Sequence, residues 1–182
     1  MILYDYDPSR GGDVARALLA GFTGCVHTDG YPTYIQVMKD LGVTHALCNV
    51  HARRKFTDLI KSTPARHDSQ TSHAQVAIDY YKQLYRIEKT VRETRDTTES
   101  LVWHQQRLAI RQEQSRPIFD QLIQWADDLL HRVVPKSMLG EALGYLVKHQ
   151  QGLALFLDDG IVEMDTNGVE NRIRPVALGR RN

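Results

Sequence analysis

The sequence predicts an α/β protein that is predominantly helical, in which a large all-helical insertion interrupts a small partial sheet. Residues 1–50 alternate short β-type runs with helical stretches, a pattern typical of parallel strands joined by helices. Residues 51–62 are helical in pattern, nearly every segment from about 73 to 157 has helical periodicity, and residues 158–182 contain a turn followed by a last helix. We therefore expect an α/β part at 1–50, a helical insertion at 51–157 and a return to the α/β part at 158–182.

The first fifty residues predict the order strand, helix, strand, helix, strand. The expected strands lie at 2–6, 24–28 and 43–50, and the expected helices at about 14–18 and 32–41. Pro32 is tolerated in the first turn of a helix, and Gly42 is a typical residue after a helix end. This alternation predicts a parallel sheet with helices packed on it.

The insertion is expected to begin with a helix at 51–62 and a polar loop at 64–72, followed by helices from about 73 to 157. One apolar face repeats with helical spacing along Ala77, Ile78, Tyr81, Leu84, Tyr85 and Glu88. Ser137 is placed to cap a later helix. Residues 92–114 are highly charged and have few apolar anchors, so we expect an exposed helical arm there. Residues 161–164 are expected to be extended.

The composition excludes several classes of protein. Hydrophobic residues make up 42% and charged residues 25% of the chain, as in ordinary soluble domains. The two cysteines are too few for a disulfide scaffold and suit a reducing cytosol. No apolar run approaches the roughly 20 residues needed to span a bilayer, so no membrane partner is expected. The net charge of +1 gives no global signal for nucleic acid.

Positive charge is concentrated in two local segments. Arg53, Arg54 and Lys55 follow directly after His51, and the last segment carries Arg172, Arg174, Arg180 and Arg181. Such local concentrations are typical of phosphate contacts, and equally of solvated helix faces. Three consecutive helical residues cannot share one face, so we expect one or two of the first group to reach phosphate while another pairs inside the protein.

Two carboxylates are candidates for metal ligation. Asp29 follows a predicted parallel strand, at the edge where ligand sites of open α/β sheets gather, and Gly30 allows close approach of another group. In isolation such an aspartate is more typical of a turn. Glu170, on the last helix, is its candidate partner, since two carboxylates can hold Mg²⁺ or Mn²⁺ through oxygen atoms. A two-metal site for phosphodiester transfer requires a third carboxylate.

Cys48 and His51 have the spacing of a metal-binding pair. A structural zinc site needs about four such ligands, and the second half of a zinc motif is absent from the sequence. This pattern favours a buried cysteine and a hydrogen-bonded histidine at a strand-to-helix junction over zinc. A small zinc-binding protein is the weaker alternative.

Four motifs in consistent order resemble the transposases of the insertion-sequence-66 type. They are Thr28-Asp29-Gly30-Tyr31-x-x-Tyr34, Cys48-x-x-His51-Ala-Arg-Arg-Lys-Phe56, Leu155-Phe-Leu-Asp-Asp-Gly160, and Asp165-x-Asn167-x-x-Glu170-Asn-x-Ile-Arg-Pro175-Val-Ala-Leu-Gly-Arg-Arg-Asn182. The resemblance implies a ribonuclease-H-like catalytic domain with an Asp-Asp-Glu triad. It matches Asp29 to the second aspartate and Glu170 to the glutamate. It also implies that Cys48 and His51 are a structural Cys-x-x-His signature.

The resemblance also implies a reaction and its partners. The intact enzyme would cleave and transfer DNA strands with Mg²⁺ or Mn²⁺, acting on transposon ends and target DNA in the bacterial cytoplasm, at the nucleoid. A homo-oligomer is left open. The first aspartate of the family lies upstream of the segment matching residues 2–6, so we expect a catalytic-domain fragment that alone binds metal weakly and is inactive. The alternative is a non-catalytic DNA-binding or assembly module, which would tolerate loss of Asp29 and Glu170 but not of the arginines.

Overall fold

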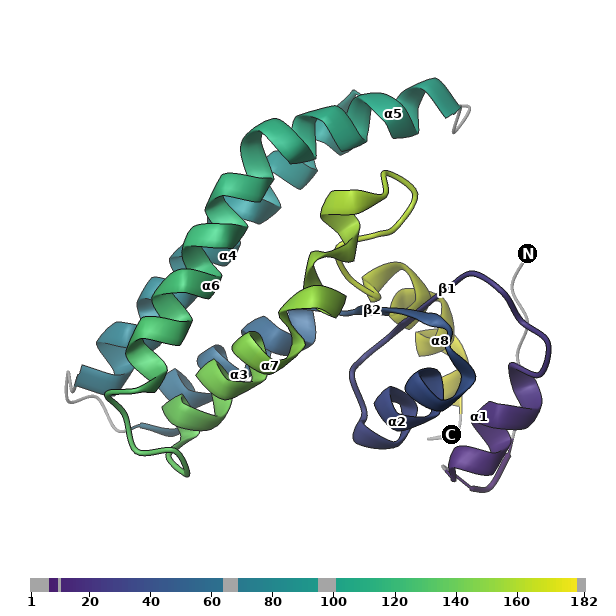
Figure 1. Ribbon diagram of the computed structural model, residues 1–182, viewed down its shortest axis with the longest axis horizontal. Coiled ribbons are helices and arrows are strands. Elements are labelled where there is room, and N and C mark those ends of the chain that lie inside the picture. The colour runs from purple at the N-terminus through teal and green to yellow at the C-terminus, as the bar shows by residue number, and fades with distance from the viewer. Residues whose placement is uncertain (1–6, 10, 64–68, 95–100, 180–182) are drawn as a thin grey trace.

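The computed structural model describes residues 7–9, 11–63, 69–94 and 101–179 (Figure 1). The described chain is mostly helical and carries one two-stranded sheet, which confirms the predicted predominance of helix. The elements are, in order, α1 (Gly12–Leu18), β1 (Cys25–Thr28), α2 (Pro32–Leu41), β2 (Thr44–Leu47), α3 (Asn49–Ser62), α4 (Ser69–Glu93), α5 (Leu101–Ile110), the π-helix η1 (Arg111–Ser115), α6 (Arg116–Leu130), α7 (Met138–Asp158) and α8 (Asn167–Gly179).

The sheet consists of β1 and β2, which run parallel and are joined through α2. Helix α2 begins at Pro32 and ends before Gly42, whose φ of 65° lies in the left-handed region. The proline therefore starts the helix and the glycine follows its end, as predicted. The third predicted strand is shorter than expected, because β2 ends at Leu47 and α3 already begins at Asn49. The strand predicted at 2–6 lies outside the described residues.

The helical region packs around α3, α4, α6 and α7. In Figure 1, α5, η1 and α6 follow one another as a long rod beside α4, while α3 and α7 lie between this pair and the sheet. The predicted face of α4 is buried, with Ala77, Tyr81 and Leu84 fully inaccessible to solvent. Helix α7 is capped as predicted, because the Ser137 hydroxyl accepts a hydrogen bond of 3.1 Å from the Gly140 amide. None of the described helices has the length and apolar character that a membrane span requires.

The arm predicted at 92–114 is helical where the structure describes it but is only partly exposed, and residues 95–100 lie outside the described residues. Residues 101–115 are helical, but the side chains of Arg107 and Arg111 are 0% exposed. They are buried because each pairs with Glu88 of α4, and Arg107 also pairs with Glu163, which follows α7. In this segment, buried ion pairs with Arg107 and Arg111 attach the helix to its neighbours at positions where the sequence has few apolar residues.

The segment between α7 and α8 contains bends rather than the extended piece expected at 161–164. It crosses to the start of α3, where Asn49 is 1% exposed. The Asn49 amide group donates to the carbonyl of Met164 at 3.2 Å and to that of Leu153 at 3.0 Å. The backbone amide of Asn49 donates to the same Met164 carbonyl at 3.1 Å. These bonds fix the position from which α8 starts.

Candidate functional site

The parallel pairing brings the ends of the two strands to one edge of the sheet. Thr28 is the register partner of Leu47, so the next residues of the two strands are Asp29 and Cys48. The Cys48 amide donates a hydrogen bond of 3.0 Å to the Thr28 carbonyl, which extends the pairing to this edge. Asp29 and the Cys48-x-x-His51 motif therefore start from neighbouring positions, although they lie far apart in the sequence.

Asp29 sits in a tight turn. Its Oδ1 accepts a hydrogen bond of 3.0 Å from the Tyr31 amide. Gly30 has a φ of 82°, which disfavours any residue with a Cβ, and an added Cβ would collide with the hydroxyl of Tyr145 on α7. The glycine is thus required both by the turn and by the close approach of α7.

An open hollow of about 280 Å³ lies beside this turn. Its lining residues are Asp29, Gly30, Tyr31, His51, Arg54, Lys55, Asp58 and Tyr145. The ammonium of Lys55 lies 4.7 Å from the centre of the Tyr145 ring. Burial, together with the charges of Cys48 and Asp29, raises the pKa of Tyr145 to about 12, so its hydroxyl keeps its proton at neutral pH.

The three consecutive basic residues of α3 divide between two surroundings. Arg54 and Lys55 line the hollow and are exposed. The guanidinium of Arg53 lies 5.8 Å from the centre of the Tyr85 ring, on the side facing α4. Two of the three side chains are therefore available to a ligand in the hollow, while Arg53 packs within the protein.

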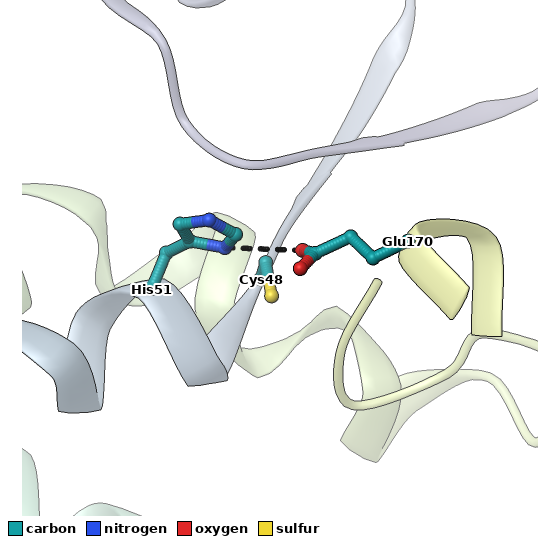
Figure 2. Close-up of side chains that lie close together, drawn as sticks. All are labelled: Cys48, His51 and Glu170. Carbon is teal, nitrogen blue, oxygen red and sulfur yellow. Dashed lines mark ion pairs between the residues drawn. The ribbon is translucent and has the colours of Figure 1, made fainter. Parts of the chain in front are cut away.

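Glu170 reaches the same edge from the first turn of α8 (Figure 2). Its Oε1 lies 3.8 Å from Nδ1 of His51 and accepts a hydrogen bond of 2.8 Å from the Thr166 hydroxyl. The backbone amide of Thr166 lies 3.3 Å from the Cys48 sulfur, to which it donates. Cys48, His51 and Glu170 form a compact group, with one ligand atom from each lying within 4.8 Å of the others.

The sequence matches the Transposase IS66 family over residues 1–182. This chain belongs to the IS66 transposase family. Its relatives include three uncharacterized proteins of Sinorhizobium fredii: y4hP, 32% identical over 99% of this chain and 33% of its own length; y4jD, 32% identical over 98% and 34%; and y4qI, 34% identical over 100% and 32%. The chain thus spans about a third of the length of these relatives. No solved structure matches it.

The residues predicted for metal and DNA binding fall into three groups at and beyond this edge. Cys48, His51 and Glu170 come together, and Asp29 faces the hollow that His51 also lines. Arg172 and Arg174 are exposed on α8, beyond Glu170. Arg180 and Arg181 lie outside the described residues. Whether these side chains bind metal or DNA stays a prediction.

Sequence reasoning missed two residues of this site, Tyr145 and Thr166. Thr166 directly precedes α8, and a threonine at the start of a predicted helix is a recognisable capping signal. Tyr145 offers no such signal, since only the packing of α7 on β2 brings its ring to Asp29.

The donor set gives a mixed answer for magnesium. Mg²⁺ prefers oxygen ligands in octahedral geometry, and Asp29 and Glu170 supply carboxylate oxygens. Within the described part of the chain, however, the one compact group of three candidate ligands joins Glu170 to a thiol and an imidazole and does not include Asp29. The two carboxylates are ligands of the type that Mg²⁺ prefers, whereas the thiol and imidazole beside Glu170 are not.

Proposed function

We propose that this chain forms part of the catalytic domain of a DNA transposase whose intact form cleaves and transfers DNA strands with Mg²⁺ or Mn²⁺. The observation that supports the proposal is the position of His51 at the carboxyl edge of the two-stranded sheet, where it lines the same hollow as Asp29 and lies 3.8 Å from Glu170. In this proposal β1 and β2 belong to a ribonuclease-H-like sheet. Family membership supports the reaction class.

The chain's own residues would bind the reactants and hold them in place. Asp29 and Glu170 would ligate the cation, which when bound activates a water or a 3′-hydroxyl and stabilises the leaving oxygen. Arg54 and Lys55, on the lining of the hollow, would neutralise the phosphates on either side of the reacting bond. The Tyr145 hydroxyl keeps its proton at neutral pH and packs against Gly30, so its ring forms part of the wall of the hollow.

The catalytic role is tested by transposition of a marked element, using the longest open reading frame that contains this chain. Asp29→Asn and Glu170→Gln should each lower the transposition frequency by more than the roughly 10–100-fold loss typical of residues that only support metal ligands. Glu113→Gln, a change of an exposed glutamate on η1, serves as the matched control and should have no effect. Wild-type frequency in both site variants would refute the proposal and favour the non-catalytic module.

The phosphate contacts are tested separately by binding of a labelled DNA duplex to the 182-residue chain as a function of salt. Arg54→Ala and Lys55→Ala should each weaken binding and reduce the slope of log affinity against log salt by about 1. Lys61→Ala is the matched control, because this lysine lies on the same helix with its side chain 77% exposed and does not line the hollow. An equal effect of all three changes would contradict a specific role for the hollow.

A further inference from the structure

Beside Glu170 lie Cys48 and His51, two possible metal ligands that the oxygen-ligated site does not use. The group of three combines one sulfur, one imidazole nitrogen and one carboxylate oxygen, all within 4.8 Å of one another. The three side chains come from the end of β2, the first turn of α3 and the first turn of α8, and they point toward one another in Figure 2. Sulfur is a poor ligand for Mg²⁺ and a good one for zinc.

Direct contacts leave this group incompletely satisfied. Nδ1 of His51 is inaccessible to solvent and has no hydrogen-bond partner in the described structure. The 3.8 Å between this nitrogen and Glu170 Oε1 is too long for a hydrogen bond. A buried nitrogen without a partner is unfavourable, and a cation between the three side chains would provide one.

We propose that Cys48, His51 and Glu170 bind a single divalent cation of the zinc class. Three protein ligands with a fourth, open position are the usual arrangement of zinc sites that exchange a ligand or bind water. The proposal goes beyond the transposase function, since it concerns a cation of another class and requires no DNA. Glu170 is common to both sites, so zinc held by Cys48 and His51 would compete with Mg²⁺ for this carboxylate.

The surroundings of the group suit this role. The Thr166 amide already donates to the Cys48 sulfur, as expected of a residue that supports a thiolate ligand. The Cys48 backbone is fixed by its bond to Thr28, and the residue is fully buried.

Closure of the site requires only a small movement. Zinc lies about 2.3 Å from sulfur and about 2.0 Å from nitrogen or oxygen, so its ligands lie within about 4 Å of each other. The side chain of Glu170 is 43% exposed and is not packed in the core, so it can move toward the cation.

The test is a titration of the metal-free 182-residue chain with Zn²⁺ by calorimetry and with Co²⁺ by absorption spectroscopy. We expect one equivalent of either ion to bind, a sulfur-to-cobalt charge-transfer band, and no displacement by excess Mg²⁺. Cys48→Ser should abolish the band. Glu170→Gln should weaken Zn²⁺ binding at least about tenfold, which corresponds to about 1.4 kcal/mol.

The chain offers a matched control in Cys25, which is exposed and free, so Cys25→Ser should leave binding and spectrum unchanged. The inference is overturned if no stoichiometric binding occurs, if the band survives Cys48→Ser, or if Cys25→Ser removes it. If Cys48→Ser lowers the helix content, the test rests on Glu170→Gln, which changes a partly exposed side chain. An unchanged Zn²⁺ affinity of the Glu170→Gln variant also overturns the inference. Zinc binding is measured without transposition, so its failure leaves the proposed function standing.

Discussion

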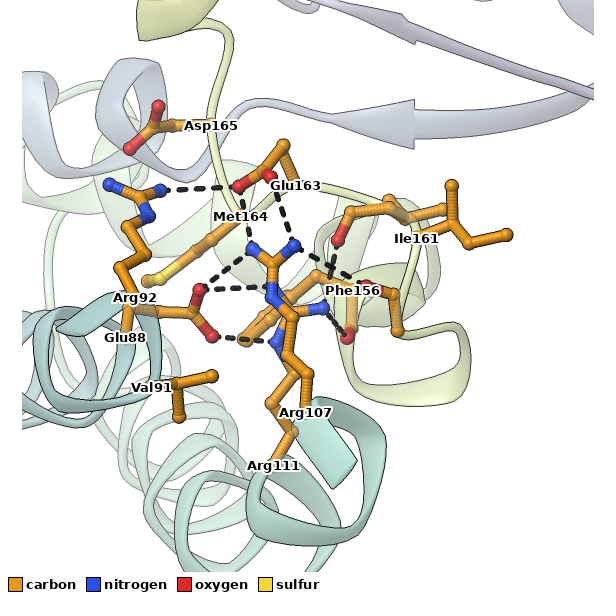
Figure 3. Close-up of polar contacts among 12 residues, drawn as sticks. Glu88, Val91, Arg92, Arg107, Arg111, Phe156, Ile161, Glu163, Met164 and Asp165 are labelled. Carbon is orange, nitrogen blue, oxygen red and sulfur yellow. Dashed lines mark hydrogen bonds and ion pairs between the residues drawn. The ribbon is translucent and has the colours of Figure 1, made fainter. Parts of the chain in front are cut away.

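Replacing Arg111 with methionine should destabilise the protein more than any surface change. Arg111 belongs to a charge network with Glu88, Arg107 and Glu163 (Figure 3). The side chains of Arg111, Glu88 and Arg107 are at most 1% exposed. The network joins α4, the α5–η1 helix and the segment after α7. Methionine keeps most of the volume of the arginine side chain, so the change removes mainly charge and hydrogen bonds.

The magnitude follows from what Arg111 holds. Its guanidinium donates to both oxygens of Glu88, at 2.6 and 2.9 Å. It also donates to the carbonyls of Phe156, Val162 and Asp159, at 2.7, 2.8 and 3.2 Å. Burial alone would raise the pKa of Glu88, but hydrogen bonds and charge from Arg111, with the charge of Arg107, lower it. Breaking a buried pair on one side costs about 3–5 kcal/mol, and the three carbonyls lose their donor as well.

The assay is urea denaturation of the 182-residue chain followed by circular dichroism, which reports its helices. Arg111→Met should lower the free energy of unfolding by at least about 3 kcal/mol. Arg16→Met is the control, because Arg16 pairs with Asp40 at 2.8 Å but both side chains are about two-fifths exposed, and such pairs contribute about 0–1 kcal/mol. A loss below about 1 kcal/mol for Arg111→Met would refute the assigned role of the network.

Two further changes test the edge of the sheet. Gly30→Ala should lower the free energy of unfolding by at least about 1 kcal/mol more than Gly42→Ala, because both glycines have positive φ but only a Cβ at position 30 meets the Tyr145 hydroxyl; equal losses would contradict the close approach of α7. Burial lowers the pKa of His27, and burial together with the charge of His27 lowers the pKa of His45. In the unfolded chain both histidines have their ordinary pKa of about 6.5, so the unfolded state binds more protons than the folded state as the pH falls through this value. Stability should therefore fall as the pH drops from 7 to 5, and a thermal midpoint that stays constant over this range would refute this inference.

Local signals explain what could be predicted from the sequence. Helix α2 begins and ends where expected because Pro32 and Gly42 act within their own turns, and Ser137 caps α7 by contacting a residue three positions away. The parallel pairing of β1 and β2 follows from strand–helix–strand alternation. In each case the information lies within a few residues of the structure that it predicts.

The burial of part of the predicted arm could not be foreseen because its partners are distant in the sequence. Arg107 and Arg111 resemble surface residues until Glu88 of α4 and Glu163 are placed beside them. The site was predicted in part for the same reason. The spacing of Cys48 and His51 is local, whereas their meeting with Glu170 depends on where α8 starts, and the role of Tyr145 depends on how α7 packs.

The start of α8 is set by side chains of the helical region rather than by the sheet alone. Arg111 holds the carbonyls of Asp159 and Val162, Arg107 holds Glu163, and Asn49 holds Met164. Glu170 follows these anchored residues in the first turn of α8, and its carboxylate accepts a hydrogen bond from Thr166. The charge network therefore supports the geometry of the site as well as the stability of the fold. It follows that the helical region contributes to positioning Glu170 beside Cys48 and His51, which an independent exposed arm could not do.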